Sequence, residues 1–251
     1  MAGDERPRPA RRDLPAKNVR DFRSALQLAL TAPADNGQPV GQAKWGVYAF
    51  YDYDGEPIYV GQTKEGLSIR VRRHLTNQRT DAVAMRILDT FEVAEVELWP
   101  LWELDALARN DRRQAQQTLD ATEYTAYLSA IEQSRFRAIL NEKIPPVSPP
   151  VELPPSYRFG LIDAATREER GHPDVRIARR AETIARLAAV AHERGEVSVG
   201  LRRVLVIQAV RLAHLSATRL AFADGRDEPS PDAIATDRLI GSVLVESDEP
   251  E

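Results

Sequence analysis

The sequence predicts a protein of the α+β class, with a small sheet built around one hairpin and a helical region near its C-terminal end. Two observations lead to this class. Aromatic and β-branched residues are concentrated in two short runs, 45–51 and 57–61, on either side of a turn. Patterns with apolar residues three or four positions apart then occupy most of the chain that follows.

Composition places the chain among soluble globular proteins. It has 251 residues, of which 43% are hydrophobic and 29% charged. No run approaches the ~18 apolar residues that a bilayer-spanning helix needs, and residues 1–17 lack the apolar segment of a secretory signal. The absence of cysteine excludes disulfides, thiolate zinc sites and a cysteine nucleophile. It suits a reducing cytosol, so we expect a cytoplasmic protein with no membrane partner.

Charge is distributed unevenly along the chain. The net charge of −4 argues mildly against a nucleic-acid partner, which usually binds a basic protein. Between residues 64 and 86, however, six basic residues stand against two acidic ones, whereas residues 89–105 hold six acidic residues and no basic one. A basic patch can therefore coexist with acidic regions elsewhere.

Composition shifts divide the chain into five segments. Six prolines between residues 144 and 155 exclude a regular helix or a central strand, and they predict an extended linker. The acidic end of the chain has few apolar residues and is expected to be mostly flexible. The segments are a disordered tail (1–16), a domain with an N-terminal helix (17–146), the proline-rich linker (147–172), a helical pair (173–224) and an acidic tail (225–251).

The hairpin is the clearest local signal. Asp54-Gly55 is a typical tight-turn pair and joins the two strand-like runs at 45–51 and 57–61. A third, half-exposed strand is predicted at 92–99, where apolar and acidic residues alternate.

Helical periodicity surrounds these strands. Leu67, Val71 and Leu75 fall on one apolar row, which predicts a helix over 67–75. Similar patterns predict helices over 19–30, 81–88 and roughly 111–140.

Two amphipathic helices are predicted beyond the linker, at 175–191 and 201–222. The second is apolar around much of its circumference, so we expect it to pack on the first domain or on another subunit. Nine arginines against five acids between residues 174 and 224 allow a DNA-positioning module. We favour a structural or dimerising helical hairpin with solvated arginines, because no recognition-helix pattern is evident.

Residues suited to phosphodiester chemistry gather on the hairpin and the helix after it. Tyr48 and Tyr59 lie on paired strands, where either one alone is best interpreted as a packing aromatic. Together with Arg70 and His74 they favour a functional role. Arg70 and His74 are four residues apart and share a helix face. A guanidinium can bond two phosphate oxygens at once, and a histidine can move a proton. Hydrolysis usually also needs a divalent cation on a carboxylate, which Glu123 could supply.

This order of residues resembles the GIY-YIG nuclease family, over about residues 45–146. The first motif corresponds to Gly46-Val47-Tyr48 and the second, ten residues later, to Tyr59-Val60-Gly61. Gly46 and Gly61 let a neighbouring backbone approach closely. The remaining correspondences are Arg70 and His74 with the RxxxH segment, Glu123 with the metal-binding glutamate, and Asn141 with the closing asparagine.

The choice of carboxylate has an alternative. Glu123 and Asn141 are eighteen residues apart, five turns at 3.6 residues per turn, so a helix reaching Asn141 would place both on one face. That distance looks longer than usual for the family, and the usual proline before the asparagine is absent. Glu132 is therefore a rival ligand, but Glu123 is preferred because it lies further from the asparagine, as the family's glutamate does.

The resemblance implies a fold, a cofactor and a set of roles. The fold is a three-stranded antiparallel sheet flanked by helices, and Mg²⁺ or Mn²⁺ binds Glu123 and a phosphate oxygen. The implied roles are to orient or deprotonate the attacking water (Tyr48, assisted by His74), to stabilise phosphate charge (Arg70), to complete the hydrogen bonding (Tyr59) and to brace the site (Asn141).

The resulting expectation is a metal-dependent endonuclease that hydrolyses DNA, double-stranded in the first instance, in restriction, defence or mobile-element biology. Lys64, Arg72 and Arg73 are expected to contact the DNA backbone without sequence specificity. Two alternatives stay open: a non-catalytic DNA-binding or assembly protein that reuses the fold, and a structure-specific repair nuclease. A homodimer through the C-terminal helices is also expected.

Overall fold

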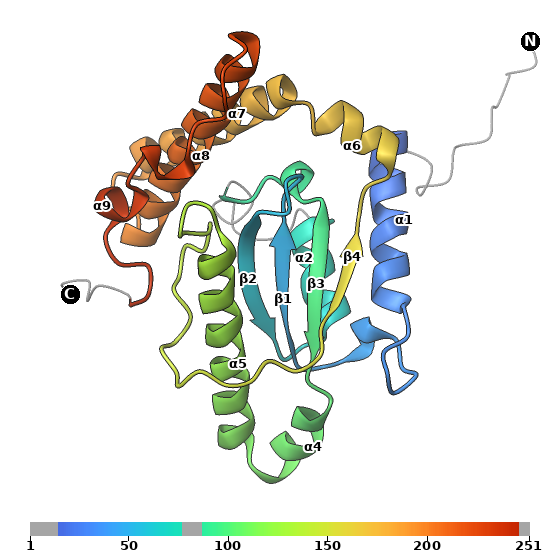
Figure 1. Ribbon diagram of the computed structural model, residues 1–251. Helices are drawn as coiled ribbons and strands as arrows, with labels where there is room; N and C mark the ends of the chain where they lie inside the picture. The colour runs from blue at the N-terminus through green and yellow to red at the C-terminus, as the bar shows by residue number, and fades with distance from the viewer. Residues whose placement is uncertain (1–14, 77–86, 246–251) are drawn as a thin grey trace, which may run out of the picture.

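The computed structural model describes residues 15–76 and 87–245, arranged around one antiparallel sheet (Figure 1). The strand order is β2-β1-β3-β4, and every neighbouring pair is antiparallel. The predicted hairpin is confirmed, with Tyr48 opposite Gly61 and Phe50 opposite Tyr59. The strands are β1 (Gly46–Tyr51), β2 (Pro57–Thr63), β3 (Glu95–Pro100) and β4 (Tyr157–Gly160).

The fourth strand corrects the prediction of a three-stranded sheet. It lies within residues 147–172, for which the sequence predicts a linker, and it pairs with the free edge of β3 from Glu95 to Leu98. Only four residues long, β4 carries little periodicity of its own. Its stability comes from the ladder to β3 and from partners such as the Arg158–Glu95 ion pair at 2.7 Å. The prolines lie before this strand and do not prevent it.

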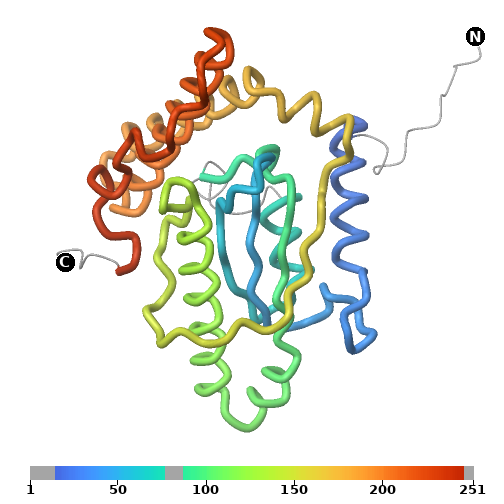
Figure 2. The backbone as a smooth tube through the Cα atoms, in the orientation of Figure 1, coloured from blue at the N-terminus to red at the C-terminus, as the bar shows by residue number. Residues whose placement is uncertain are grey.

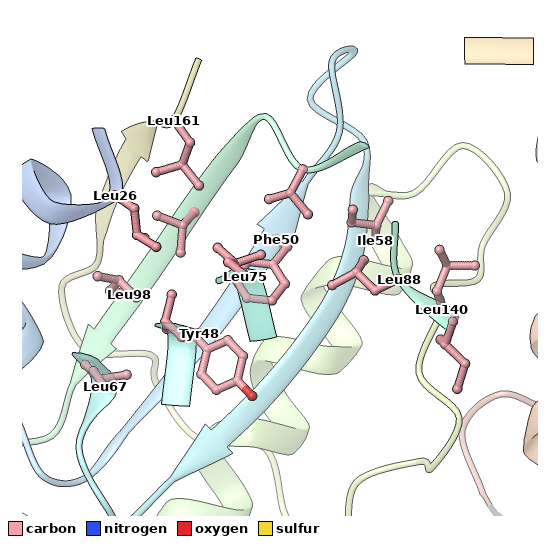
Figure 3. Packing of buried hydrophobic residues seen from close by; sticks show 14 of the residues in the cluster. Leu26, Tyr48, Phe50, Ile58, Leu67, Leu75, Leu88, Leu98, Leu140 and Leu161 are labelled. Carbon is pink, nitrogen blue, oxygen red and sulfur yellow. The ribbon is translucent and has the colours of Figure 1, made fainter. Parts of the chain in front are cut away.

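Helices cover both faces of the sheet (Figure 1). One face, with Tyr48 and Phe50, packs against α1 (Lys17–Thr31) and α2 (Leu67–Leu75). Figure 3 shows Tyr48, Phe50, Leu67 and Leu75 among the buried side chains of this face. The opposite face, with Val47 and Ala49, packs against α5 (Arg112–Gln133), which follows α4 (Glu103–Asn110). The bounds of α2 are those the apolar row predicted.

Helix α5 ends at Gln133, seven residues before the predicted end at Leu140. Ser134 adopts an extended conformation, and its hydroxyl bonds to Glu56 and to the carbonyl of Ala138. The chain then turns back along β2, where the Leu140 amide donates to the Ile58 carbonyl at 2.8 Å. The helix therefore does not reach Asn141, and Glu123 and Asn141 do not share one helix face, because only Glu123 is helical.

The C-terminal helices arch over the end of the sheet at which β1 turns into β2 (Figures 1 and 2). Helix α8 packs along α7, and apolar residues of both join the core below, which agrees with the expectation that α8 packs on the first domain. The elements are α6 (Ala164–Arg170), α7 (Pro173–Arg194), α8 (Val199–Ala223) and α9 (Thr236–Ile240), with 3-10 turns η2 (Val40–Gln42), η3 (Thr90–Glu92) and η4 (Pro231–Ala233).

A buried ion cluster fastens these helices to the hairpin turn. Three guanidinium groups converge on Asp52 Oδ2, from Arg176 and Arg180 of α7 at 3.0 Å and from Arg211 of α8 at 2.8 Å. Glu92 Oε2 lies 3.3 Å from Arg180 Nε. These five residues, called the Asp52 cluster below, are all buried. The expectation of solvated arginines on the helical pair is wrong for these three, because the partners that neutralise them come from a distant part of the chain.

Two expectations remain: that the chain has no bilayer-spanning run, and that a helix lies at 81–88. In the part of the chain that the structure describes, α8 is long and apolar enough to span a membrane by length and composition, a test that core helices also pass. Its Arg211 lies in the Asp52 cluster and its apolar residues join the core. The helix predicted at 81–88 falls almost wholly outside the described residues, as do Arg79 and Arg86.

Candidate active site

Tyr48 forms the centre of the candidate site. Its side chain is fully buried on β1, and its phenol extends across β2 at Gly61. A Cβ atom at position 61 would lie 2.5 Å from the Tyr48 hydroxyl oxygen and 3.0 Å from a ring carbon of Tyr59. Glycine at position 61 therefore lets the two tyrosines occupy the same side of the hairpin.

Gly46 has a related role at the start of β1. A Cβ atom there would lie 2.8 Å from the Trp99 carbonyl oxygen of β3 and 2.9 Å from the Leu67 side chain of α2. Its absence lets α2 pack closely on the sheet, and α2 carries the next two residues of the site.

Helix α2 directs Arg70 and His74 at the Tyr48 hydroxyl. The row Leu67, Val71 and Leu75 is buried against the sheet, so the adjacent row lies at its margin. His74 Nε2 lies 2.9 Å from the Tyr48 hydroxyl oxygen. Arg70 Nε donates to the same oxygen at 3.3 Å, which leaves the two terminal nitrogens of the guanidinium for another partner.

Tyr59 completes the aromatic part of the site. Its ring stacks on that of Tyr48 with centroids 6.2 Å apart, and it lies 5.5 Å from the His74 ring centroid. Burial raises the pKa of Tyr59, and Arg70 and the Tyr48 hydroxyl only partly offset this effect. Four of the residues selected from the sequence are therefore in mutual contact.

Glu123 approaches from α5, which covers the opposite face of the sheet. Its side chain is buried beside the edge strand β2, where the side chain and the backbone N–H of Gln62 act as donors that lower its pKa. The charge of Glu123 acts through space on Tyr48 and Tyr59, and the charge of Arg70 acts on Glu123. The rival Glu132 is exposed, nine residues further along α5.

The electrostatic state of the site follows from burial. Burial, with the neighbouring Asp120, raises the pKa of Glu123 to about 7 against the opposing effects of Gln62 and Arg70. Burial, assisted by the positive charge of Arg70 and Arg73, lowers the pKa of His74 to about 4. Burial also raises the pKa of Tyr48 well above that of an ordinary phenol. At neutral pH the site thus holds a neutral imidazole, a protonated phenol and a carboxyl group close to its midpoint.

Asn141 braces the edge of the sheet. Its Oδ1 accepts from the Val60 amide at 3.0 Å, and its Nδ2 donates to the Val60 carbonyl at 2.8 Å. Both ends of its amide are thereby committed to β2, in the strand that carries Tyr59 and Gly61.

The three expected DNA contacts differ in their freedom. Lys64 is exposed, with its amine 3.3 Å from Gln116 Oε1 of α5. Arg73 instead donates to Glu65 at 2.9 Å. The third, Arg72, bonds to the side chains of Ser68 and Gln27. Lys64 is thus the one of the three whose protein contact is weakest and most easily exchanged for a phosphate.

Sequence reasoning missed the polar residues that surround Glu123. Gln62 directly follows the second motif, and Asp120 lies one helical turn before Glu123, so both positions were adjacent to selected residues. Gln62 Nε2 donates to Asp120 Oδ1 at 2.8 Å, and Gln116 Nε2 donates to the same oxygen at 2.8 Å. The signal that could have found Gln116 and Asp120 is the helical spacing of 116, 120 and 123 on α5.

The donor atoms at Glu123 suit a hard cation. Within residues 15–76 and 87–245, no three His, Cys, Asp or Glu side chains are grouped closely enough to enclose a metal ion. Mg²⁺ commonly binds through one or two carboxylates and keeps several waters or substrate oxygens. Glu123 is a buried carboxylate at the margin of a site that also holds Arg70, whose guanidinium can bind phosphate. This arrangement fits that pattern.

Comparisons of this chain with protein-family models, with curated proteins and with solved structures gave no match. The function must therefore be inferred from the site itself.

Proposed function

We propose that this protein is a metal-dependent endonuclease of the GIY-YIG type, which hydrolyses phosphodiester bonds in DNA. The observation that carries the proposal is the convergence of Arg70 and His74 on the hydroxyl of Tyr48, with Tyr59 stacked beside it and Glu123 at the same strand edge. Packing alone does not require a buried phenol to have both a guanidinium and an imidazole as partners.

Tyr48 and His74 are suited to remove a proton from an attacking water. The Tyr48 hydroxyl donates to His74 Nε2 when the histidine proton is on Nδ1, and the low pKa of His74 keeps that nitrogen unprotonated. The phenol oxygen can then accept a proton from water as its own proton passes to Nε2. Tyr48 therefore acts as a relay and does not have to exist as a phenolate.

Arg70 and Glu123 are suited to the phosphate. Because Arg70 uses Nε for Tyr48, its terminal nitrogens are available to two phosphate oxygens, where they would stabilise the charge that develops during hydrolysis. Mg²⁺ or Mn²⁺ held by Glu123 would supply further charge neutralisation at the phosphate. Tyr59 and Asn141 keep β2 in place, and with it the hydroxyl group of Tyr59.

Double-stranded DNA is the proposed partner, with Lys64 beside the site as a backbone contact. A second copy of the chain is also proposed to bind through the C-terminal helices, because Leu220 and Phe222 of α8 are exposed, Phe222 to 74%. Sedimentation of the wild-type protein beside Phe222→Ser would show whether this end of α8 joins two copies.

Plasmid cleavage tests the enzymatic proposal. Supercoiled DNA is incubated with Mg²⁺ or Mn²⁺ and with the wild-type protein, Tyr48→Phe or Glu123→Ala. We expect nicking or linearisation by the wild type and a loss of about 10²- to 10⁴-fold in rate for Tyr48→Phe, as for removal of a general acid–base group. Tyr157→Phe is the matched control, since its hydroxyl accepts from the Asp35 amide, away from the site. Equal cleavage by all four proteins would reject this site.

The non-catalytic alternative rests on one observation, that donors of Gln62 on the edge of β2 already favour the ionised Glu123 carboxylate. A scaffold could use this contact simply to protect the strand edge. DNA binding without cleavage, unchanged in Glu123→Ala, would favour the scaffold. Faster cleavage of branched than of linear duplexes would indicate the repair-type nuclease.

A further inference from the structure

A chain of polar side chains lies behind Glu123 on the α5 side of β2. It begins at Lys64, whose amine contacts Gln116 Oε1 at 3.3 Å, and continues from Gln116 Nε2 to Asp120 Oδ1 at 2.8 Å. Asp120 Oδ1 also accepts from Gln62 Nε2 at 2.8 Å. The Gln62 side chain acts in turn as a donor that lowers the pKa of Glu123. One amide thus acts on two carboxylates on successive turns of the same helix.

The orientation of the Gln62 amide is fixed by this arrangement. An amide presents two N–H donors on nitrogen and an acceptor on oxygen, and carboxylates only accept when ionised. Gln62 turns its nitrogen toward Asp120, and its Oε1 is buried without a hydrogen-bond partner. A buried oxygen without a partner is unfavourable, which indicates that the Asp120 carboxylate determines the orientation.

The position of Gln62 along β2 explains why it lies beside Glu123. β2 is an edge strand, and along its open side Leu140 bonds to the Ile58 carbonyl and Asn141 to both polar groups of Val60. Gln62 is the next residue with this outward orientation, and its backbone N–H acts as a donor that lowers the pKa of Glu123. The backbone N–H and the side-chain amide of this one residue therefore both favour the ionised carboxylate.

We infer that Gln62 is a positioning residue for Glu123, and that Asp120 clamps its amide so that the Glu123 carboxylate faces the site with one orientation. This inference deepens the proposed function and rests on it for the identity of the bound ion. Partners that orient a metal ligand typically change metal affinity about 10- to 100-fold when they are removed.

Mn²⁺ binding tests the inference without any need for DNA cleavage. Titration calorimetry at pH 8 compares the wild type with Gln62→Met, Asp120→Ala and Asp120→Asn. We expect Gln62→Met and Asp120→Ala to weaken Mn²⁺ binding about 10- to 100-fold. Asp120→Asn should bind close to the wild type, because its amide oxygen can still accept from Gln62. Gln117→Ala, an exposed neighbour on α5, is the control and should leave affinity unchanged.

A second measurement observes Glu123 in the absence of metal. With ¹³C-labelled glutamate, the Glu123 carboxyl resonance is assigned by comparison with Glu123→Gln. We expect this resonance to shift and broaden in Gln62→Met and Asp120→Ala and to stay in place in Asp120→Asn. A merely structural role for Asp120 would lower the melting temperature without this rescue pattern.

The outcomes separate the two proposals. If the wild type binds Mn²⁺ through Glu123 but Gln62→Met binds equally well with an unchanged resonance, the positioning role is wrong and the proposed function survives. If wild type and Glu123→Gln both fail to bind Mn²⁺ and DNA is not cleaved, the proposed function fails. The carboxyl resonance then decides the positioning role by itself.

Discussion

The hairpin carries two polar clusters, and they are built in opposite ways. At its turn, the Asp52 cluster places carboxylates directly against guanidinium groups. Burial pushes the pKa of Asp52 upward, but Arg211, Arg176 and Arg180 outweigh it and hold that pKa below its ordinary value. Further down the strands, Glu123 lies near a single half-buried guanidinium, and its pKa is raised to about 7.

The difference separates a structural cluster from the proposed metal site at Glu123. In the Asp52 cluster the protein supplies its own counter-charges, so removal of Asp52 leaves buried guanidinium groups with too few carboxylates to neutralise them. At Glu123 the protein keeps a carboxyl group whose ionised form is disfavoured by burial and by the neighbouring Asp120. Ionisable groups held in an unfavourable state concentrate at functional sites, because their partner arrives from outside. Removal of a carboxylate should therefore destabilise the protein at Asp52 and stabilise the metal-free protein at Glu123.

The largest effect is expected at Asp52. Asp52→Ala leaves three buried guanidinium groups without their shared carboxylate, and loss of one partner of a buried ion pair costs about 3–5 kcal/mol. Urea denaturation of the purified protein measures the loss. A stability equal to that of the wild type would mean that the cluster does not fasten the C-terminal helices to the hairpin.

Arg70→Ala should reduce cleavage activity strongly and stability only slightly. We expect a loss of about 10²- to 10³-fold in cleavage rate, comparable to removing one donor to a developing oxyanion. The urea midpoint should move little, because Arg70 is only partly buried and lies in no salt bridge of the described residues. Arg219→Ala, which breaks the exposed ion pair with Asp174, is the control for removal of an arginine. A large stability loss with intact cleavage would contradict the comparison.

Glu123→Gln should stabilise the metal-free protein at high pH. The folded-state pKa is raised above the ordinary value of 4.5, so wild-type stability is complete below pH 4.5 and falls as pH rises through about 7. At about 1.4 kcal/mol per pKa unit, the wild type loses about 3 kcal/mol by pH 8. Denaturation at pH 5 and pH 8 should show a gain for Glu123→Gln only at pH 8. Added Mn²⁺ should stabilise the wild type and not the variant.

The smallest effect is expected at Lys64. Lys64→Ala should weaken DNA binding modestly for every sequence and reduce the slope of log affinity against log salt by about one unit, as for loss of one phosphate contact. Arg73→Ala should change this slope less, because Arg73 is paired with Glu65. Fluorescence anisotropy with a labelled duplex at several salt concentrations makes the measurement. Equal slopes for wild type and Lys64→Ala would remove Lys64 from the proposed DNA contact.

Local patterns were sufficient for the parts of the site that lie close together in the sequence. The hairpin with Tyr48 and Tyr59, and the helix with Arg70 and His74, follow from side-chain periods of two and 3.6 residues over runs of fewer than ten residues. The order of these residues along the chain also agrees with the contact between the hairpin and α2.

Longer-range features escaped the same reasoning. The strand β4 exists because β3 offers a free edge, and the chain near Asn141 follows β2 instead of continuing α5. The Gln62–Asp120 contact spans 58 positions of the chain, so no local pattern reveals it.

The sequence by itself determined where helices and strands begin along most of the chain and which polar residues share a strand or a helix row, since these depend on neighbours a few positions away. Only the tertiary structure decided the charge environment of those residues. Arg176, Arg180 and Arg211 look like solvated arginines in the sequence, yet they are buried on Asp52, more than 120 positions earlier. Burial and ion pairing depend on distances between remote segments, and these are fixed only when the chain packs.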